Sequence, residues 1–97
     1  MISKAAQSIL RSLIQAERDQ DHEASEIVCE GTACWQGTRR TSRRVVNELL
    51  RAGLLRNNSE AGNALERYAL NEHGIRAAAD RAYVPRGLLE ALAERST

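Results

Sequence analysis

The chain has 97 residues and a mass of 10.7 kDa, with 42% hydrophobic residues, 28% charged residues and a formal net charge of +1. These values are typical of one globular domain over residues 1–97, and the scarcity of aromatic residues predicts an aliphatic core. No apolar run approaches the roughly 18 residues of a membrane span, and polar residues interrupt the N-terminus, which excludes a signal peptide. We therefore expect a cytoplasmic protein with no membrane contact and with reduced cysteines.

The first third of the chain predicts a helix followed by a short linking unit. Ser3 can cap a helix that ends near Asp19, because apolar residues recur at the spacing of one buried stripe. Alternating apolar residues and a central glycine in the segment 26–37 favour a hairpin or an irregular strand–turn unit. A short helix over 32–36 is the alternative.

The middle of the chain predicts a helix over 41–52, with Thr41 or Ser42 as its cap and Gly53 at its end. At about 100° per residue, its valines and leucines gather on one side of the helix. The opposite side gathers basic and amide side chains: Arg44, Asn47 and Arg51, with Arg43 beside them and Arg40 if the helix begins that early. The buried face and the basic face are therefore separate.

The last third predicts a hairpin over 54–70 with a loop of about eight residues, and then two helices. The first of these helices begins after Asn71, and its expected apolar stripe comprises Ile75, Ala78, Ala79 and Ala82. The second covers 85–97 and has more leucines than a free tail should expose, namely Leu88, Leu89 and Leu92. Because so small a core contributes only a few kcal/mol, we expect these leucines to pack on a second copy in a homodimer. The alternative is that they fold back onto their own core.

Positive charge is concentrated in the middle of the chain. Residues 38–56 hold six basic side chains and one acidic side chain, whereas 1–37 hold three and six, and 57–97 hold five and six. Several arginines at the start of a helix oppose its macrodipole, which favours an anionic partner, and arginine suits phosphate oxygens and guanine edges. The alternatives are a solvated face or a protein partner, and a pI near 7.9 counts against strong nonspecific binding to nucleic acid.

Two separate segments resemble the winged helix-turn-helix superfamily. Leu49 to Leu54, "LLRAGL", is similar to the end of a recognition helix, and Tyr68 to Gly74, "YALNEHG", is similar to the segment that opens the helix after the wing. The resemblance covers about residues 41–80. It implies an α+β fold that is mostly helical, with a winged-helix-like three-helix core, a β-hairpin wing and an extra C-terminal helix.

The same resemblance implies a DNA-binding transcriptional regulator that acts by occupying its site. The helix 41–52 would enter the major groove of double-stranded DNA, and a two-fold dimer would require a roughly palindromic site. The side chains expected to face the groove are Arg43, Arg44, Asn47 and Arg51, and those expected to hold phosphates are Arg39, Arg40, Arg56 and Arg67.

A protein-interaction module on the same scaffold is the rival hypothesis. Near-neutral charge, acidic flanks and a predicted wing tip whose only ionised residue is Glu60 suit a protein that binds an acidic protein partner. A phage-encoded anti-CRISPR or another inhibitor of a nucleic-acid machine is one such protein. A structural or assembly component of a phage is a third alternative.

No pattern in the sequence predicts catalysis, a metal site or a cofactor. Cys29 and Cys34, with His22 and His73, lack the second compact ligand pair of a zinc site. We therefore expect both cysteines to be buried free thiols that flank a turn. Trp35 could stack on a base, but as the only tryptophan it is expected to cover the small core.

Overall fold

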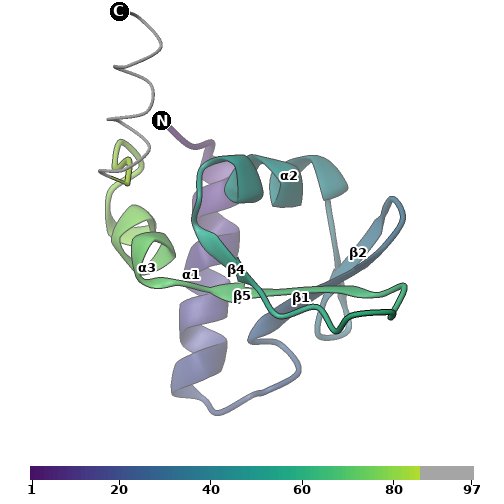
Figure 1. Cartoon of the computed structure of the whole chain (residues 1–97). Coiled ribbons are helices and arrows are strands. Elements are labelled where there is room, and N and C mark those ends of the chain that lie inside the picture. Colours follow the sequence, from purple (N-terminus) through teal and green to yellow (C-terminus); the bar gives the residue numbers. More distant parts are fainter. Residues whose placement is uncertain (86–97) are drawn as a thin grey trace, which may run out of the picture.

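The computed structural model describes residues 1–85, and over this range the chain forms three helices and five strands (Figure 1). The helices are α1 (Lys4–Arg18), α2 (Arg43–Arg51) and α3 (Glu72–Ala79). The strands are β1 (Glu26–Glu30), β2 (Ala33–Gln36), β3 (Arg39–Thr41), β4 (Leu55–Asn57) and β5 (Glu66–Leu70). No helix within this range has the length and apolar character needed to cross a membrane.

All five strands form one antiparallel sheet in the order β3-β2-β1-β5-β4. β1 pairs with β2 in a hairpin and also with β5, so the segment 26–41 and the hairpin 54–70 belong to the same sheet. The prediction of a mostly helical, winged-helix-like fold is therefore wrong, and the protein is a sheet-rich α+β structure. The prediction failed because the segment 26–37, expected to be a short linking unit, forms β1 and β2, residues 39–41 add β3, and β1 pairs nonlocally with β5.

The three helix caps predicted from the sequence are confirmed. The hydroxyl of Ser3 accepts a hydrogen bond from the backbone N–H of Ala6 at 3.1 Å, and that of Ser42 accepts from Val45 at 3.5 Å. The side-chain oxygen of Asn71 caps α3 in the same way, by accepting a hydrogen bond from the backbone N–H of Gly74. Each cap satisfies a backbone donor that has no partner within its helix.

The core lies between the helices and one face of the sheet. Its fully buried side chains include Ala6, Leu10 and Leu13 in α1, Val46 and Leu49 in α2, Ala77 in α3, Ile27, Cys29 and Cys34 in β1 and β2, and Leu54 just before β4. α1 and α3 lie side by side, and α2 crosses the same face of the sheet (Figure 1). Each fully buried leucine, isoleucine or valine contributes about 1.5–3 kcal/mol to stability relative to an exposed one.

Cys29 and Cys34 form a disulfide within this core. The β1–β2 register places the two residues directly opposite each other, with 4.1 Å between their Cα atoms, and both side chains are fully buried. The prediction of free thiols is therefore wrong, because the hairpin turns two cysteines five positions apart into cross-strand neighbours. The hairpin itself was one of the two alternatives for this segment and is confirmed, and the cytoplasmic location stays a prediction.

α3 differs from its prediction in length and in buried stripe. It ends at Ala79, and it buries Gly74, Ala77 and Ala78 while Ile75 is 51% exposed. The carbonyl of Ala78 accepts hydrogen bonds from two side chains of α1, which fixes this side of α3 against α1. The helix expected over 85–97, with its dimerisation residues Leu88, Leu89 and Leu92, lies outside the described residues except for Pro85, so the homodimer stays a prediction.

Candidate nucleic-acid interface

Arg43 begins α2, and its guanidinium is bound to β5. Its two terminal nitrogens donate to the two carboxylate oxygens of Glu66, at 3.2 and 3.0 Å, and the hydroxyl of Tyr68 donates to the same carboxylate. The hydrogen bonds from Arg43 and Tyr68 hold the pKa of Glu66 below its ordinary value, and the bond to Glu66 raises the pKa of the Arg43 guanidinium. Arg43 thus anchors α2 to the sheet.

Glu48 is the acidic residue of α2 and lies between Arg44 and Arg51 on its exposed side. Its carboxylate accepts two hydrogen bonds from Ser3, at 2.8 Å from the backbone nitrogen and 2.6 Å from the hydroxyl. The hydroxyl bond is the main cause of a lowered Glu48 pKa, to which Arg44 and Arg51 add. The carboxylate therefore points to the start of α1, and among residues 1–85 neither arginine forms an ion pair.

A hollow follows α2 along its border with α1. One part, of about 540 Å³, lies between the N-terminal end of α1 and α2, and its charged lining residues are Arg44, Arg51 and Glu48. A second part, of about 270 Å³, lies between α1 and β3 and shares Ala5, Ser42 and Val45 with the first. The polar residues that line the second part are four with hydroxyls, one amide and two arginines: Ser8, Ser12, Thr41, Ser42, Gln36, Arg39 and Arg40. We call these two adjoining hollows, which Arg39, Arg44 and Arg51 line, the basic groove.

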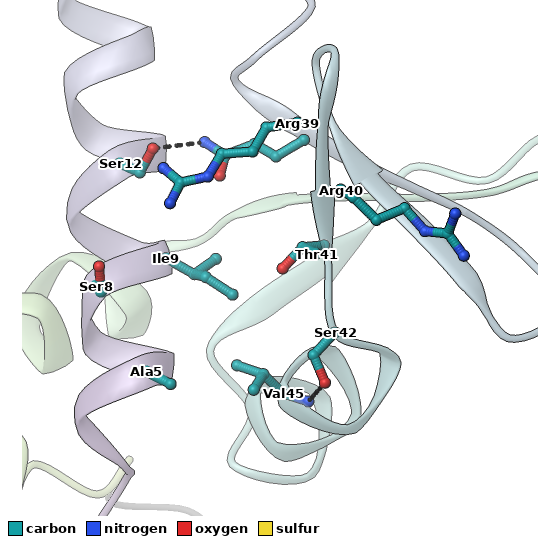
Figure 2. Close-up of a pocket in the computed structure, with 10 residues that line it drawn as sticks. Ala5, Ser8, Ile9, Ser12, Arg39, Arg40, Thr41, Ser42 and Val45 are labelled. Atoms are coloured by element: carbon teal, nitrogen blue, oxygen red, sulfur yellow. Dashed lines mark hydrogen bonds between the residues drawn. The ribbon is translucent and has the colours of Figure 1, made fainter.

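The two neighbouring arginines of β3 point to opposite sides of the sheet. Figure 2 shows Arg39 directed toward Ser12 on α1, inside the basic groove, whereas Arg40 is directed away from it. Successive side chains of a strand alternate between its faces, so this separation follows from the strand itself. The guanidinium carbon of Arg40 instead lies over the indole ring of Trp35, 5.2 Å from the ring centroid.

The eight arginine and asparagine side chains predicted as DNA contacts thus fall into three groups. Arg39, Arg44 and Arg51 line the basic groove, and half-buried Asn47 lies on the exposed side of α2 near them. Arg43 is bound to Glu66. Strand alternation and register place Arg40, Arg56 and Arg67 on the opposite face of the sheet, which we call the outer face.

Sequence reasoning missed the residues that shape the basic groove. Ser8 and Ser12 are four positions apart and therefore share one side of α1, next to its apolar stripe, and this spacing was the available signal. No local signal pointed to the hydrogen bonds of Ser3 with Glu48, because the two residues are 45 positions apart. Trp35 was expected to cover the core, but it faces the outer side of the sheet and lies outside the buried core cluster.

Comparison of the chain with protein-family models, with curated proteins and with solved structures finds no match in any of the three. The resemblance to winged helix-turn-helix proteins therefore stays a prediction from two short segments.

Proposed function

We propose that the protein binds double-stranded DNA along the basic groove and acts as a transcriptional regulator by occupying its site. The observation that carries the proposal is that Arg39, Arg44 and Arg51 line two adjoining hollows, while Glu48, the only acid of α2 and also a lining residue, is bound to Ser3. Among residues 1–85 none of these three arginines forms an ion pair, so their guanidinium groups can donate to phosphate oxygens, which supply most of the affinity of DNA-binding proteins.

The groove has the chemistry of a phosphate site in the part between α1 and β3. There the hydroxyls of Ser8, Ser12 and Thr41 accompany the guanidinium of Arg39, next to the start of α2. Hydroxyls, guanidinium groups and helix N-termini are all common phosphate donors. Arg44, Asn47 and Arg51 then lie along the exposed side of α2, where arginine suits guanine and asparagine suits adenine.

Two hydrogen-bonded anchors hold α2 rigid for this role. The Arg43–Glu66 pair fixes its first turn to β5, and the Glu48–Ser3 pair fixes its middle to α1. A rigid helix loses little conformational entropy when it binds, which favours affinity. A homodimer would present two such helices to a palindromic site.

Fluorescence anisotropy with a labelled duplex of random sequence, at about 50 and 200 mM salt, tests the proposal. We expect micromolar binding at the lower salt and a loss of at least about tenfold in the double variant Arg44→Ala/Arg51→Ala. The matched control is Arg18→Ala/Arg76→Ala, which removes two exposed charges from α1 and α3 and should bind as the wild type does. Equal binding by both double variants would rule out the basic groove as the DNA site.

The rival proposal is an acidic protein partner at the same groove. The feature that favours it is the tip of the β4–β5 hairpin, over 58–64, whose ionised residue is the exposed Glu60. An acid there would repel a DNA backbone. Duplex DNA that fails to bind at 50 mM salt would favour this rival, and an affinity purification with the Arg44→Ala/Arg51→Ala variant as the negative control would then identify the partner.

A further inference from the structure

The outer face of the sheet carries a row of four side chains that the pairing register aligns. Arg40 lies opposite Trp35, Trp35 opposite Val28, and Val28 opposite Arg67, on the neighbouring strands β3, β2, β1 and β5. Neighbouring strands are about 4.8 Å apart, so the row extends about 14 Å from one arginine to the other. An apolar pair with one aromatic ring thus lies between two guanidinium groups.

This face is open to solvent in the described part of the chain. The side chains that α1, α2 and α3 bury against the sheet all lie on its other face. On the outer face Trp35, Val28 and Arg67 are half-buried and Arg40 and Arg56 are exposed, and the only fully covered strand residue is the small Ala69. The apolar centre of the row is therefore accessible at the surface.

On the outer face the charged side chains within the row are basic, and the acidic side chains lie outside the row. Arg56 lies opposite Ala69, next to the Arg67 end, and adds a third guanidinium. The two acids on this face are Glu26 and Glu30. Glu26 approaches Arg67 at 3.8 Å, and Arg67 keeps 41% of its side chain exposed, so this ion pair is weak.

We propose that the outer face binds single-stranded nucleic acid, with Trp35 as the stacking platform and with Arg67 and Arg56 as the phosphate contacts. Proteins that bind single strands combine aromatic rings on which bases stack with a basic surface that follows the backbone. Four-stranded sheets that bind RNA stack two or three bases on side chains of one face in this way. Arg40 already occupies the position of a stacked base over the Trp35 ring, and its exposed side chain can move onto the incoming base.

The proposal is independent of duplex binding, because the two surfaces lie on opposite faces of the sheet. The basic groove contains no aromatic side chain among its lining residues, and the outer face contains none of Arg39, Arg44 and Arg51. A strand with unpaired bases can stack on Trp35, whereas a duplex keeps its bases covered. Each surface therefore has its own ligand and its own set of variants.

Trp35 is the only tryptophan, so its fluorescence reports on this surface alone. We would titrate the full chain with a 15-nucleotide oligothymidylate at about 50 mM salt, following both tryptophan fluorescence and the anisotropy of a labelled oligonucleotide. We expect micromolar binding that quenches Trp35. Arg56→Ala/Arg67→Ala should weaken it about tenfold or more and reduce the salt slope of log affinity by about 1.4, or about 0.7 for each lost phosphate contact.

Further variants separate stacking from folding. Trp35→Leu should weaken binding at least about fivefold by anisotropy, whereas Trp35→Phe, which keeps an aromatic ring, should restore most of the affinity. The control Arg18→Ala/Arg76→Ala should bind as the wild type does. Circular dichroism would test whether each variant is folded.

Three results would overturn the assignment. The first is no oligothymidylate binding by the folded wild type, and the second is binding without any change in Trp35 fluorescence. The third is a loss of oligothymidylate binding in Arg44→Ala/Arg51→Ala but not in Arg56→Ala/Arg67→Ala, which would place single strands in the basic groove. Failure of the duplex proposal would instead appear as unchanged duplex binding in Arg44→Ala/Arg51→Ala.

Discussion

Arg43 and Glu66 form a two-point ion pair between α2 and β5, with nitrogen–oxygen distances of 3.2 and 3.0 Å. The two side chains are 25% and 35% exposed, so solvent screens the pair, but its bidentate geometry makes it stronger than an ordinary surface pair. We expect Arg43→Ala to lower the free energy of unfolding by about 0.5–1.5 kcal/mol. Urea denaturation of Arg43→Ala, Glu66→Gln and the double variant Arg43→Ala/Glu66→Gln measures the coupling energy between the two side chains. Purely additive losses would show that the pair does not stabilise the fold.

Acidification should destabilise the protein through the same carboxylates. The pKa values of Glu48 and Glu66 are both lowered, by hydrogen bonds from Ser3 and from Arg43 respectively. Between these lowered values and the ordinary glutamate value of about 4.3, the unfolded chain binds more protons than the folded one, so stability increases with pH in this window. The contribution is complete above about pH 5 and is lost as the pH falls through the folded pKa values.

The test is the free energy of unfolding at several pH values between about 3 and 6. Glu48→Gln/Glu66→Gln should flatten the dependence relative to the wild type. Glu60→Gln, at the exposed hairpin tip, removes the same type of charge where no hydrogen-bonded partner is described, and serves as the control. A double variant with the full acid dependence of the wild type would contradict the assignment.

Ser3 has two structural roles, and its removal should show both. Its hydroxyl caps α1 by accepting from Ala6, and it also donates to Glu48. Ser3→Ala should therefore lower the free energy of unfolding by about 1–2 kcal/mol, which is more than the loss of a typical helix cap. Ser42→Ala removes only a cap and should cost about 1 kcal/mol or less, and thermal unfolding of the two variants compares them. Equal losses would mean that the hydrogen bond from the Ser3 hydroxyl to Glu48 does not stabilise the fold.

Reduction of the Cys29–Cys34 disulfide should destabilise the protein without removing the fold. The bond closes a loop of only five positions, for which the chain-entropy estimate is about 2 kcal/mol. Urea denaturation with and without a reductant measures the loss, and Cys29→Ala/Cys34→Ala should lose at least as much. In the oxidised protein neither cysteine should react with a thiol reagent even after unfolding. Immediate labelling of the native protein would contradict the disulfide.

The elements that the sequence predicted well are those specified by local patterns. α1 and α2 have apolar stripes at helical spacing, and Ser3, Ser42 and Asn71 cap their helices as expected. The hairpin over 54–70 was predicted from its polar, glycine-containing tip. β3 has no such pattern, since its three residues are polar and two are exposed. The β1–β5 pairing joins residues about 40 positions apart, so only the folded structure shows it.

The candidate nucleic-acid interface was also predicted only as far as local sequence patterns specify it. Charge counting located the arginines, but the direction of each side chain depends on which element contains it. Arg39 and Arg40 were expected near the start of a helix, and β3 instead directs them to opposite faces. Arg43 was expected to face the groove of DNA, and Glu66, 23 positions away, binds it. These outcomes depend on tertiary pairing, which local periodicity does not encode.

Gly74 has a steric role that can be tested by a single methyl group. It lies in the first turn of α3, and a Cβ atom built there would overlap the backbone carbonyl of Leu54 and lie 2.6 Å from a methyl carbon of Leu70. In an unconstrained helix, Gly→Ala stabilises by about 1 kcal/mol. We expect Gly74→Ala to destabilise instead, by about 2–3 kcal/mol, because a backbone carbonyl cannot rotate away.

Gly62→Ala separates this steric effect from backbone conformation. Gly62 has φ +82° and open space around its Cα, so alanine there should cost only the strain of a left-handed conformation, about 1 kcal/mol. Thermal unfolding of the two variants measures both losses. If Gly74→Ala were instead more stable than the wild type, helix propensity would outweigh the contact. α3 would then not pack as closely against the Leu54 backbone as the structure requires.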